Sequence, residues 1–136
     1  MGRGELAEEA GDGALRRVRA WFRTSPASVP VVRRWARRQV QQVLEGDRLD
    51  VFLLLLSELV TNAVRHTRGP RVEVELTLDG IVVAAVYDDS PDKPSPRRAG
   101  PDDTGGRGLA LVERLSDRWG IERLAHGNRV WFQVSI

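Results

Sequence analysis

The segment from about Leu49 to His66 constrains the fold more than any other part of the chain. Its first half contains six consecutive apolar residues, Val51 to Leu56, so this half is apolar on every side of a helix. A helix that is apolar all round is normally buried among other elements. We therefore expect the most buried helix of the domain here, and Arg68-Gly69-Pro70 is expected to end it.

Two further segments before this helix are predicted from helical spacing and capping signals. Ser28 is expected to cap a helix with Pro30 in its first turn, which continues to about Leu44 and stops at Gly46. Residues 1–13 are rich in Gly, Glu and Ala and are predicted to be disordered, while the amphipathic piece Ala14 to Phe22 is predicted to be a short helix. We take residues 1–23 as a flexible N-terminal extension and residues 24–136 as one folded domain.

The remaining segments alternate between strands and one more helix. Residues 71–78 alternate apolar and polar, Asp79-Gly80 is a strong hairpin signal, and residues 81–87 are apolar on both faces, as in an inner strand. A third helix is expected over residues 107–115 and a second hairpin over residues 118–136. This order predicts an α+β fold: a two-layer sandwich with the helices on one face of a mostly antiparallel sheet.

Composition excludes several classes of function. The chain has no cysteine, which excludes disulfides and thiol catalysis, and only two histidines, too few for a histidine-based metal site. No apolar run approaches the length of a membrane span, and the N-terminal residues lack the apolar middle of a signal peptide. We therefore expect a cytoplasmic protein that does not associate with a membrane. The net charge is only +2, and the arginines are interrupted by apolar residues at helical spacing. This pattern favours a solvated or partner-facing helix over a nucleic-acid groove.

A polar strip follows the buried half of the central helix. Glu58, Asn62 and His66 lie at i, i+4 and i+8, which places them on one side. The strip is either an exposed helical edge or a site in which Asn62 offers a carbonyl oxygen to a hard cation and Glu58 acts as a base. Mg²⁺ suits such a site, because it takes few protein oxygens and completes its shell with phosphates and water.

Two other segments also have both a plain and a functional interpretation. Asp88 ends the apolar strand 81–87, so it is either part of a polar turn or a carboxylate at the base of a cleft, where it can accept a hydrogen bond from an exocyclic amino group. Gly105-Gly106-Arg107-Gly108 precedes the third helix and is either a hinge or a phosphate-binding helix start. The proline-rich loop 90–105 is long enough to be functional.

In this order, the segments resemble a known family of ATPases. Residues 58–66, 86–90 and 105–112 are similar to the N, G1 and G2 boxes of the histidine-kinase-like (GHKL) ATPases, whose fold is the Bergerat-type sandwich. More narrowly, Ser57-Glu58-Leu59-Val60-Thr61-Asn62-Ala63 and Gly106-Arg107-Gly108-Leu109 resemble the anti-sigma-factor serine/threonine kinases of bacteria. The resemblance covers about residues 24–136.

The resemblance implies a role for each matching residue. Asn62 would bind Mg²⁺, Glu58 would be the general base, Asp88 would hold the adenine amino group, and loop 90–105 would be the ATP lid. Gly106-Arg107-Gly108-Leu109 would bind the nucleotide, with both glycines against the phosphates. The protein would phosphorylate a serine of a STAS-domain antagonist, bind a sigma factor and form a homodimer.

The chain also departs from the family pattern. Ser90 and Pro91 stand where the G1 box usually has glycine, and Asn128-Arg129-Val130 stands where a threonine is often found near the last strands. Three functions therefore stay open: an ATP-dependent protein kinase that binds a sigma factor, a non-catalytic nucleotide-binding interaction module, and, from the arginine-rich helices, a nucleic-acid-binding protein.

Overall fold

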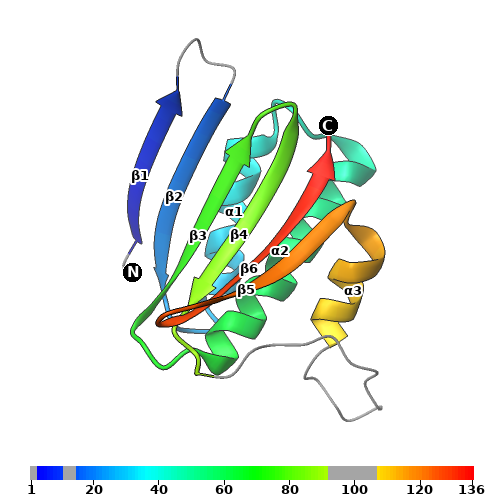
Figure 1. The fold of residues 1–136 in the computed structure, drawn as a ribbon. Coiled ribbons are helices and arrows are strands. Elements are labelled where there is room, and N and C mark those ends of the chain that lie inside the picture. The colour runs from blue at the N-terminus through cyan, green and yellow to red at the C-terminus, as the bar shows by residue number, and fades with distance from the viewer. Residues whose placement is uncertain (1–2, 11–14, 92–106) are drawn as a thin grey trace.

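The protein folds into one sheet covered on one face by helices (Figure 1). The computed structural model describes residues 3–10, 15–91 and 107–136, with residues 3–10 and Arg107 described by their backbone only. Every strand in the described part is antiparallel to its neighbours, and the sheet order is β1-β2-β3-β4-β6-β5. In chain order the elements are β1 Arg3–Ala10, β2 Leu15–Arg23, α1 Ser28–Val40, α2 Gly46–His66, β3 Arg71–Leu78, β4 Ile81–Asp88, α3 Arg107–Leu115, β5 Arg118–Leu124 and β6 Gly127–Ser135.

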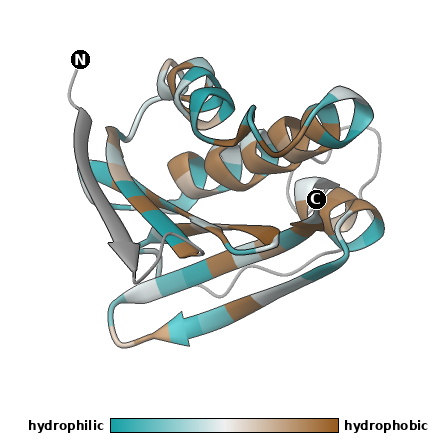
Figure 2. Ribbon diagram, turned by 90° about the horizontal axis from the view of Figure 1, so that it is seen from above, coloured by the Kyte–Doolittle hydropathy of each residue, from teal (hydrophilic) through white to brown (hydrophobic). Residues whose placement is uncertain are grey.

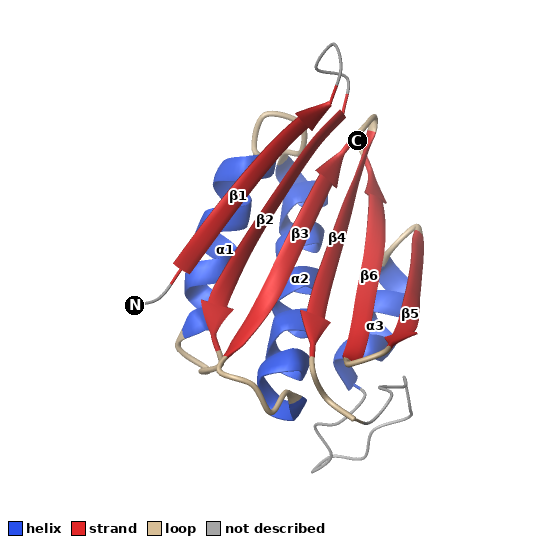
Figure 3. Ribbon diagram, turned by 60° about the vertical axis from the view of Figure 1, so that its left-hand side comes forward, coloured by secondary structure: helices blue, strands red, loops and turns tan. Residues whose placement is uncertain are grey.

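The arrangement confirms the predicted two-layer α+β sandwich. Figure 3 shows the sheet as one layer and α1, α2 and α3 together behind it. Seen from above in Figure 2, the hydrophobic sides of the helices are turned toward the sheet. The core therefore lies between the two layers, and the other face of the sheet has no helix over it in the described part of the chain.

Helix α2 occupies the middle of the helical layer, as its apolar first half predicts. It packs against α1 on one side, α3 on the other, and the central strands beneath. Phe52, Leu55 and Leu56 are completely buried, and the Phe52 ring lies 5.6 Å from that of Phe132 on β6. Leu54 is the exception, at 40% exposure, because it is on the side of α2 that faces solvent.

Helix α1 follows its predicted apolar stripe but not its predicted ends. Val32, Trp35 and Val40 are buried, as the helical spacing requires. The residue before the helix is Ala27, and the hydroxyl of Ser28 donates to the carbonyl of Arg23 (2.7 Å) instead of capping the helix. The helix ends at Val40 rather than Leu44, and Gly46, expected to stop it, begins α2 with a φ of +57°.

The short helix predicted for Ala14 to Phe22 is wrong, because this segment is strand β2. Val18, Ala20 and Phe22 are buried at alternate positions, whereas Arg19 between the first two is exposed and Trp21 between the last two is half-buried. The Phe22 ring meets Trp35 edge-on at 5.5 Å, so the strand contributes to the core. Residues 3–10, expected to be disordered, pair with β2 along their whole length. Residues 15–23 therefore belong to the same sheet as the rest of the domain.

Both predicted hairpins are present, β3 with β4 and β5 with β6. The turn at Asp79-Gly80 joins β3 to β4, and Gly80 has the positive φ (+72°) expected there. β4 then pairs with β6 so that Asp88 lies directly opposite Asn128. This pairing brings together the end of β4 and the start of β6, and hydrogen bonds between Asp89 and Thr67 place the C-terminal end of α2 beside the end of β4. No helix in the described residues is long and apolar enough to cross a membrane.

Candidate functional site

The polar strip predicted on α2 is present, and it lies at the boundary between core and solvent. Glu58 and Asn62 are both half-buried, whereas His66, in the last turn, is exposed. Their neighbours on the core side, Leu59 and Ala63, are buried. The strip is therefore neither a fully exposed edge nor part of the core, and its side chains lie where a ligand can reach them.

Glu58 lies against the start of α3. A methyl group added to Gly108 would come within 2.6 Å of Glu58 Oε2 and 3.1 Å of its Cβ. The glycine therefore allows the carboxylate to approach the first turn of α3 closely. The next residue, Leu109, is buried in the core, so its side chain fixes the helix start in place and is not free to contact a ligand.

Asp88 is a buried carboxyl group at the end of β4. It is only 9% exposed, and its Oδ1 accepts hydrogen bonds from the Ser90 backbone N–H (2.8 Å) and from the Asn128 side-chain amide (3.4 Å). Burial raises the pKa of Asp88, while these two hydrogen bonds and the nearby His66 act in the opposite direction. Both bonds go to the same oxygen, so Oδ2 takes no part in them.

The hydrogen bond from Ser90 bears on the polar-turn interpretation of this segment. A bond from the N–H of residue i+2 to an Asp side chain is an Asx turn, so the polar-turn interpretation is correct for the backbone. The carboxyl group is nevertheless buried at the end of a core strand, as the cleft interpretation requires. The polar turn is therefore present, and a cleft at the buried carboxyl group stays a prediction.

A polar network around Asp88 includes Ser90 and Asn128, two departures from the family pattern, and Arg123, which the sequence did not single out. Asn128 is completely buried and also contacts the Ser90 carbonyl (3.4 Å), while Arg123 donates to that carbonyl (2.9 Å) and to the Asn128 side-chain oxygen (3.2 Å). Asn128 stands where the resemblance leads one to expect a threonine, and it contacts Asp88. The family residue is thus absent, but a polar partner for the carboxyl group is present.

Asp89 fastens the end of β4 to the loop after α2. Its carboxylate accepts hydrogen bonds from the Thr67 hydroxyl and from the backbone N–H groups of Arg68 (2.6 Å) and Gly69 (3.0 Å). The Thr67 hydroxyl, followed by the Arg68 N–H, holds the pKa of Asp89 below its usual value. These bonds keep Asp88, the preceding residue, close to the last turn of α2.

The structure brings some of the predicted site residues together, and others lie outside the residues that it describes. Glu58 meets Gly108, and Asp88 lies near His66 at the end of the strip that carries Asn62. Gly106 and most of the predicted lid (residues 92–105) lie outside the described residues, and of Arg107 only the backbone is described. The predicted start of the third helix at Arg107 is confirmed.

The donor set is chemically suited to a magnesium nucleotide. Asn62 supplies a carboxamide oxygen, Glu58 a carboxylate, and Asp88 a recessed carboxyl group with one oxygen outside the network. Within the described residues there is no cluster of three or more His, Cys, Asp or Glu side chains that could hold a metal alone. A cation bound here would need oxygens from its ligand, which is how Mg²⁺ is commonly held with phosphates.

Comparison with known proteins gives the family of the chain. The family model described as histidine kinase-like ATPase domain matches residues 22–134, which include β3, β4, β5, all but the last residue of β6, helices α1, α2 and α3, and every residue of the predicted site. No curated protein matches the chain. The chain belongs to the histidine kinase-like ATPase domain family.

Proposed function

We propose that the protein binds ATP with Mg²⁺, phosphorylates a serine of a STAS-type anti-sigma antagonist and binds a sigma factor, as a homodimer. Membership of an ATPase domain family implies ATP as the ligand. The single observation that carries the proposal further is the contact between Glu58 and Gly108. It puts a carboxylate beside a helix N-terminus, which is where the phosphates of a nucleotide are favoured.

Each residue has a distinct part in this proposal. The recessed Asp88 accepts a hydrogen bond from the adenine amino group, and the network of Asn128 and Ser90 keeps the carboxyl group in position. Asn62, one helical turn after Glu58, provides the protein oxygen for Mg²⁺. When bound, Mg²⁺ neutralises charge on the phosphates.

Glu58 accepts the serine proton during the transfer of phosphate. The partner's serine oxygen forms a bond to the γ-phosphorus, the bond from that phosphorus to the β-phosphate oxygen breaks, and the serine proton passes to the Glu58 carboxylate. The N–H groups at the start of α3 face the phosphate end and stabilise its charge. A half-buried carboxylate at this place is accessible to a partner's side chain.

A second function is favoured by the region after Asp88. Ser90 is 2% exposed, and its carbonyl accepts a hydrogen bond from Arg123. Family members usually have glycine in this region, where the backbone must come close to the nucleotide. A filled, hydrogen-bonded turn suits a non-catalytic module that binds nucleotide and regulates by protein contact alone.

Calorimetric titration of ATP with and without Mg²⁺ tests the binding site. Asn62→Ala should weaken binding mainly when Mg²⁺ is present, because it removes the metal's protein oxygen. Asp88→Asn should weaken binding in both conditions, because it changes the acceptor for adenine. Gln133→Ala on the uncovered face of the sheet is the control and should leave the affinity unchanged. Equal affinities for all four proteins would refute the site assignment.

Transfer to a STAS-domain protein separates the kinase from the binding module. Glu58→Gln keeps the size of the side chain against Gly108 but removes the base, so we expect ATP binding to persist while transfer falls by about 10²–10⁴-fold. Glu113→Gln, on an exposed position of α3, is the matched control. Mass spectrometry of the STAS protein is the measurement. Full transfer by Glu58→Gln would exclude the base assignment, and no transfer by wild type despite tight ATP and partner binding would favour the module.

A further inference from the structure

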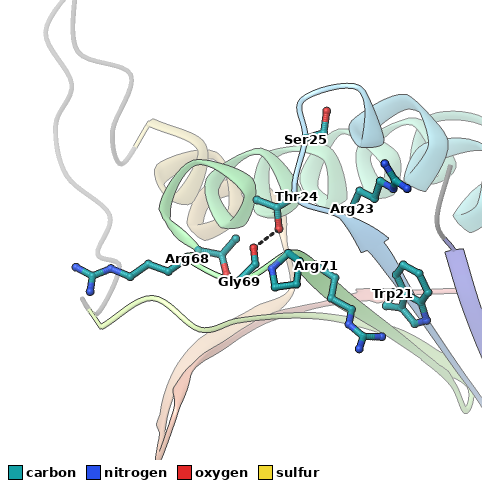
Figure 4. A pocket seen from close by; sticks show the side chains of 9 residues that line it. Trp21, Arg23, Thr24, Ser25, Arg68, Gly69 and Arg71 are labelled. Carbon is teal, nitrogen blue, oxygen red and sulfur yellow. Dashed lines mark hydrogen bonds between the residues drawn. The ribbon is translucent and has the colours of Figure 1, made fainter.

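A pocket that takes no part in the nucleotide site lies at the same end of the sheet. Its volume is about 830 Å³, and its walls are the end of β2 with the turn that follows (residues 21 and 23–25) and the loop from α2 to β3 (residues 67–71). Figure 4 shows the side chains of this pocket, with Trp21 and Arg71 next to one another. Nothing in the proposed transfer of phosphate uses it.

The pocket is positively charged and has no acidic side chain in its wall. Arg23, Arg68 and Arg71 line it, and none of them forms an ion pair with any residue that the structure describes. Arg23 and Arg71 are also directly opposite one another in the pairing of β2 with β3. Their side chains point apart in Figure 4, so the pocket presents positive charge at two separate places in its wall.

Three carboxylates lie on neighbouring segments, and none of them forms an ion pair with the arginines of the pocket in the described part of the chain. Asp89 is held on the loop by Thr67 and by backbone N–H groups. Glu75 is paired with Arg19 (3.0 Å), further along the sheet. Glu73 lies opposite Trp21 and is exposed, outside the residues that form the pocket.

The walls are joined to one another, so the pocket is formed without a ligand. The Thr24 hydroxyl donates to the Gly69 carbonyl (2.7 Å), and the Thr24 N–H donates to the Pro70 carbonyl (3.0 Å). The Arg71 guanidinium lies 4.9 Å from the centre of the Trp21 ring, which orients this planar cation beside a flat, half-buried indole. A planar guanidinium held in this way is suited to a carboxylate.

We propose that this pocket binds an acidic segment of a partner protein, with one carboxylate at Arg71, another at Arg23, and the peptide lying against Trp21 (Figure 4). The volume is that of a short stretch of peptide rather than of a single ion. A nucleic acid is less suitable, because Glu73 and Glu75 follow the pocket along β3 and would repel a continuing row of phosphates. The proposal does not depend on ATP binding, so it can hold or fail separately from the proposed function.

Fluorescence anisotropy tests the proposal, with a short fluorescein-labelled peptide of alternating glutamate and glycine as the probe. The double variant Arg23→Ala with Arg71→Ala should bind this peptide about tenfold or more weakly than wild type. Arg71→Lys keeps the charge but loses the planar group, and it should also bind more weakly. Arg118→Ala, an exposed arginine of β5, removes a charge outside the pocket and should change the affinity less than twofold, as distant surface charges are screened.

Three outcomes would overturn the proposal. Weakening by Arg118→Ala as large as that by the double variant would show attraction by overall charge only. Tighter binding of a single-stranded oligothymidylate than of the peptide at physiological salt, lost in the double variant, would assign the pocket to nucleic acid. Absence of saturable peptide binding to the wild-type protein would show that the pocket does not bind acidic peptides.

Discussion

Replacement of Gly127 by alanine tests how closely the end of β4 is held against the start of β6. Gly127 has a φ of +128°, which L-residues with a side chain rarely adopt. An added Cβ would lie 1.8 Å from the Asp88 carbonyl oxygen and 2.7 Å from the Asp89 Cα. All of these are backbone atoms, so no change of rotamer can relieve the overlap. The strands themselves must separate at this end.

The expected cost has two parts. The backbone conformation costs of order 1–3 kcal/mol for a residue other than glycine. Displacing packed atoms typically costs a further ~1–3 kcal/mol. Gly80→Ala provides the matched control, because Gly80 also has a positive φ (+72°) but an added Cβ there would meet nothing within 4 Å. That variant should lose only the backbone part, about 1–2 kcal/mol.

Urea unfolding followed by circular dichroism measures both variants against wild type. Gly127→Ala should unfold at a lower urea concentration than Gly80→Ala. The difference between their free energies of unfolding should be about the cost of the overlap, with similar slopes for both if unfolding remains two-state. Asp88 is displaced in the same variant, so its affinity for ATP should fall, whereas Gly80→Ala should bind ATP as wild type does. Equal midpoints for the two variants would show that the overlap at Gly127 is relieved without cost, and the reasoning would fail.

Three further variants test other contacts near the site. Asp89→Asn should lower stability at neutral pH and flatten its decline between about pH 5 and pH 2 in pH-dependent unfolding, because a carboxyl group with a lowered folded pKa stabilises when ionised and loses this contribution as pH falls. Asn128→Ala removes the buried amide that contacts Asp88 and should cost about 1–3 kcal/mol in urea unfolding. Gly108→Ala should change stability little, because gains in helix propensity of up to ~1 kcal/mol offset the contact, yet transfer to a STAS protein should fall as Glu58 is displaced.

The parts of the fold that could be predicted from sequence are those with a local cause. The turn at Asp79-Gly80 and the apolar stripe of α1 depend on residues close in the chain, and both are present. Strand β2 was missed because Leu15, Val18 and Phe22 fit a helical spacing, while Val18, Ala20 and Phe22 fit a strand equally well. Pairing with β3, which is distant in sequence, decides between the two.

The same distinction applies to the site. Glu58 and Asn62 lie one turn apart on a single helix, so their common side follows from spacing alone. The Asx turn at Ser90 is also local, and a polar turn at that place was one of the two interpretations. Asn128 could not be found in this way, because its contact with Asp88 depends on the register of β4 against β6. Its burial next to a carboxyl group is a consequence of tertiary structure.

The pairing of β4 with β6 has a consequence for the order in which the domain assembles. Helix α2 and the β3–β4 hairpin contain only short-range contacts, which form within microseconds in isolated segments. Asp88 and Asn128 are 40 positions apart, and closure of a loop between such distant residues must precede their contact. The strip on α2 therefore exists before the recess around Asp88 does. In a refolding experiment, helical signal should therefore recover first and the capacity to retain a nucleotide last.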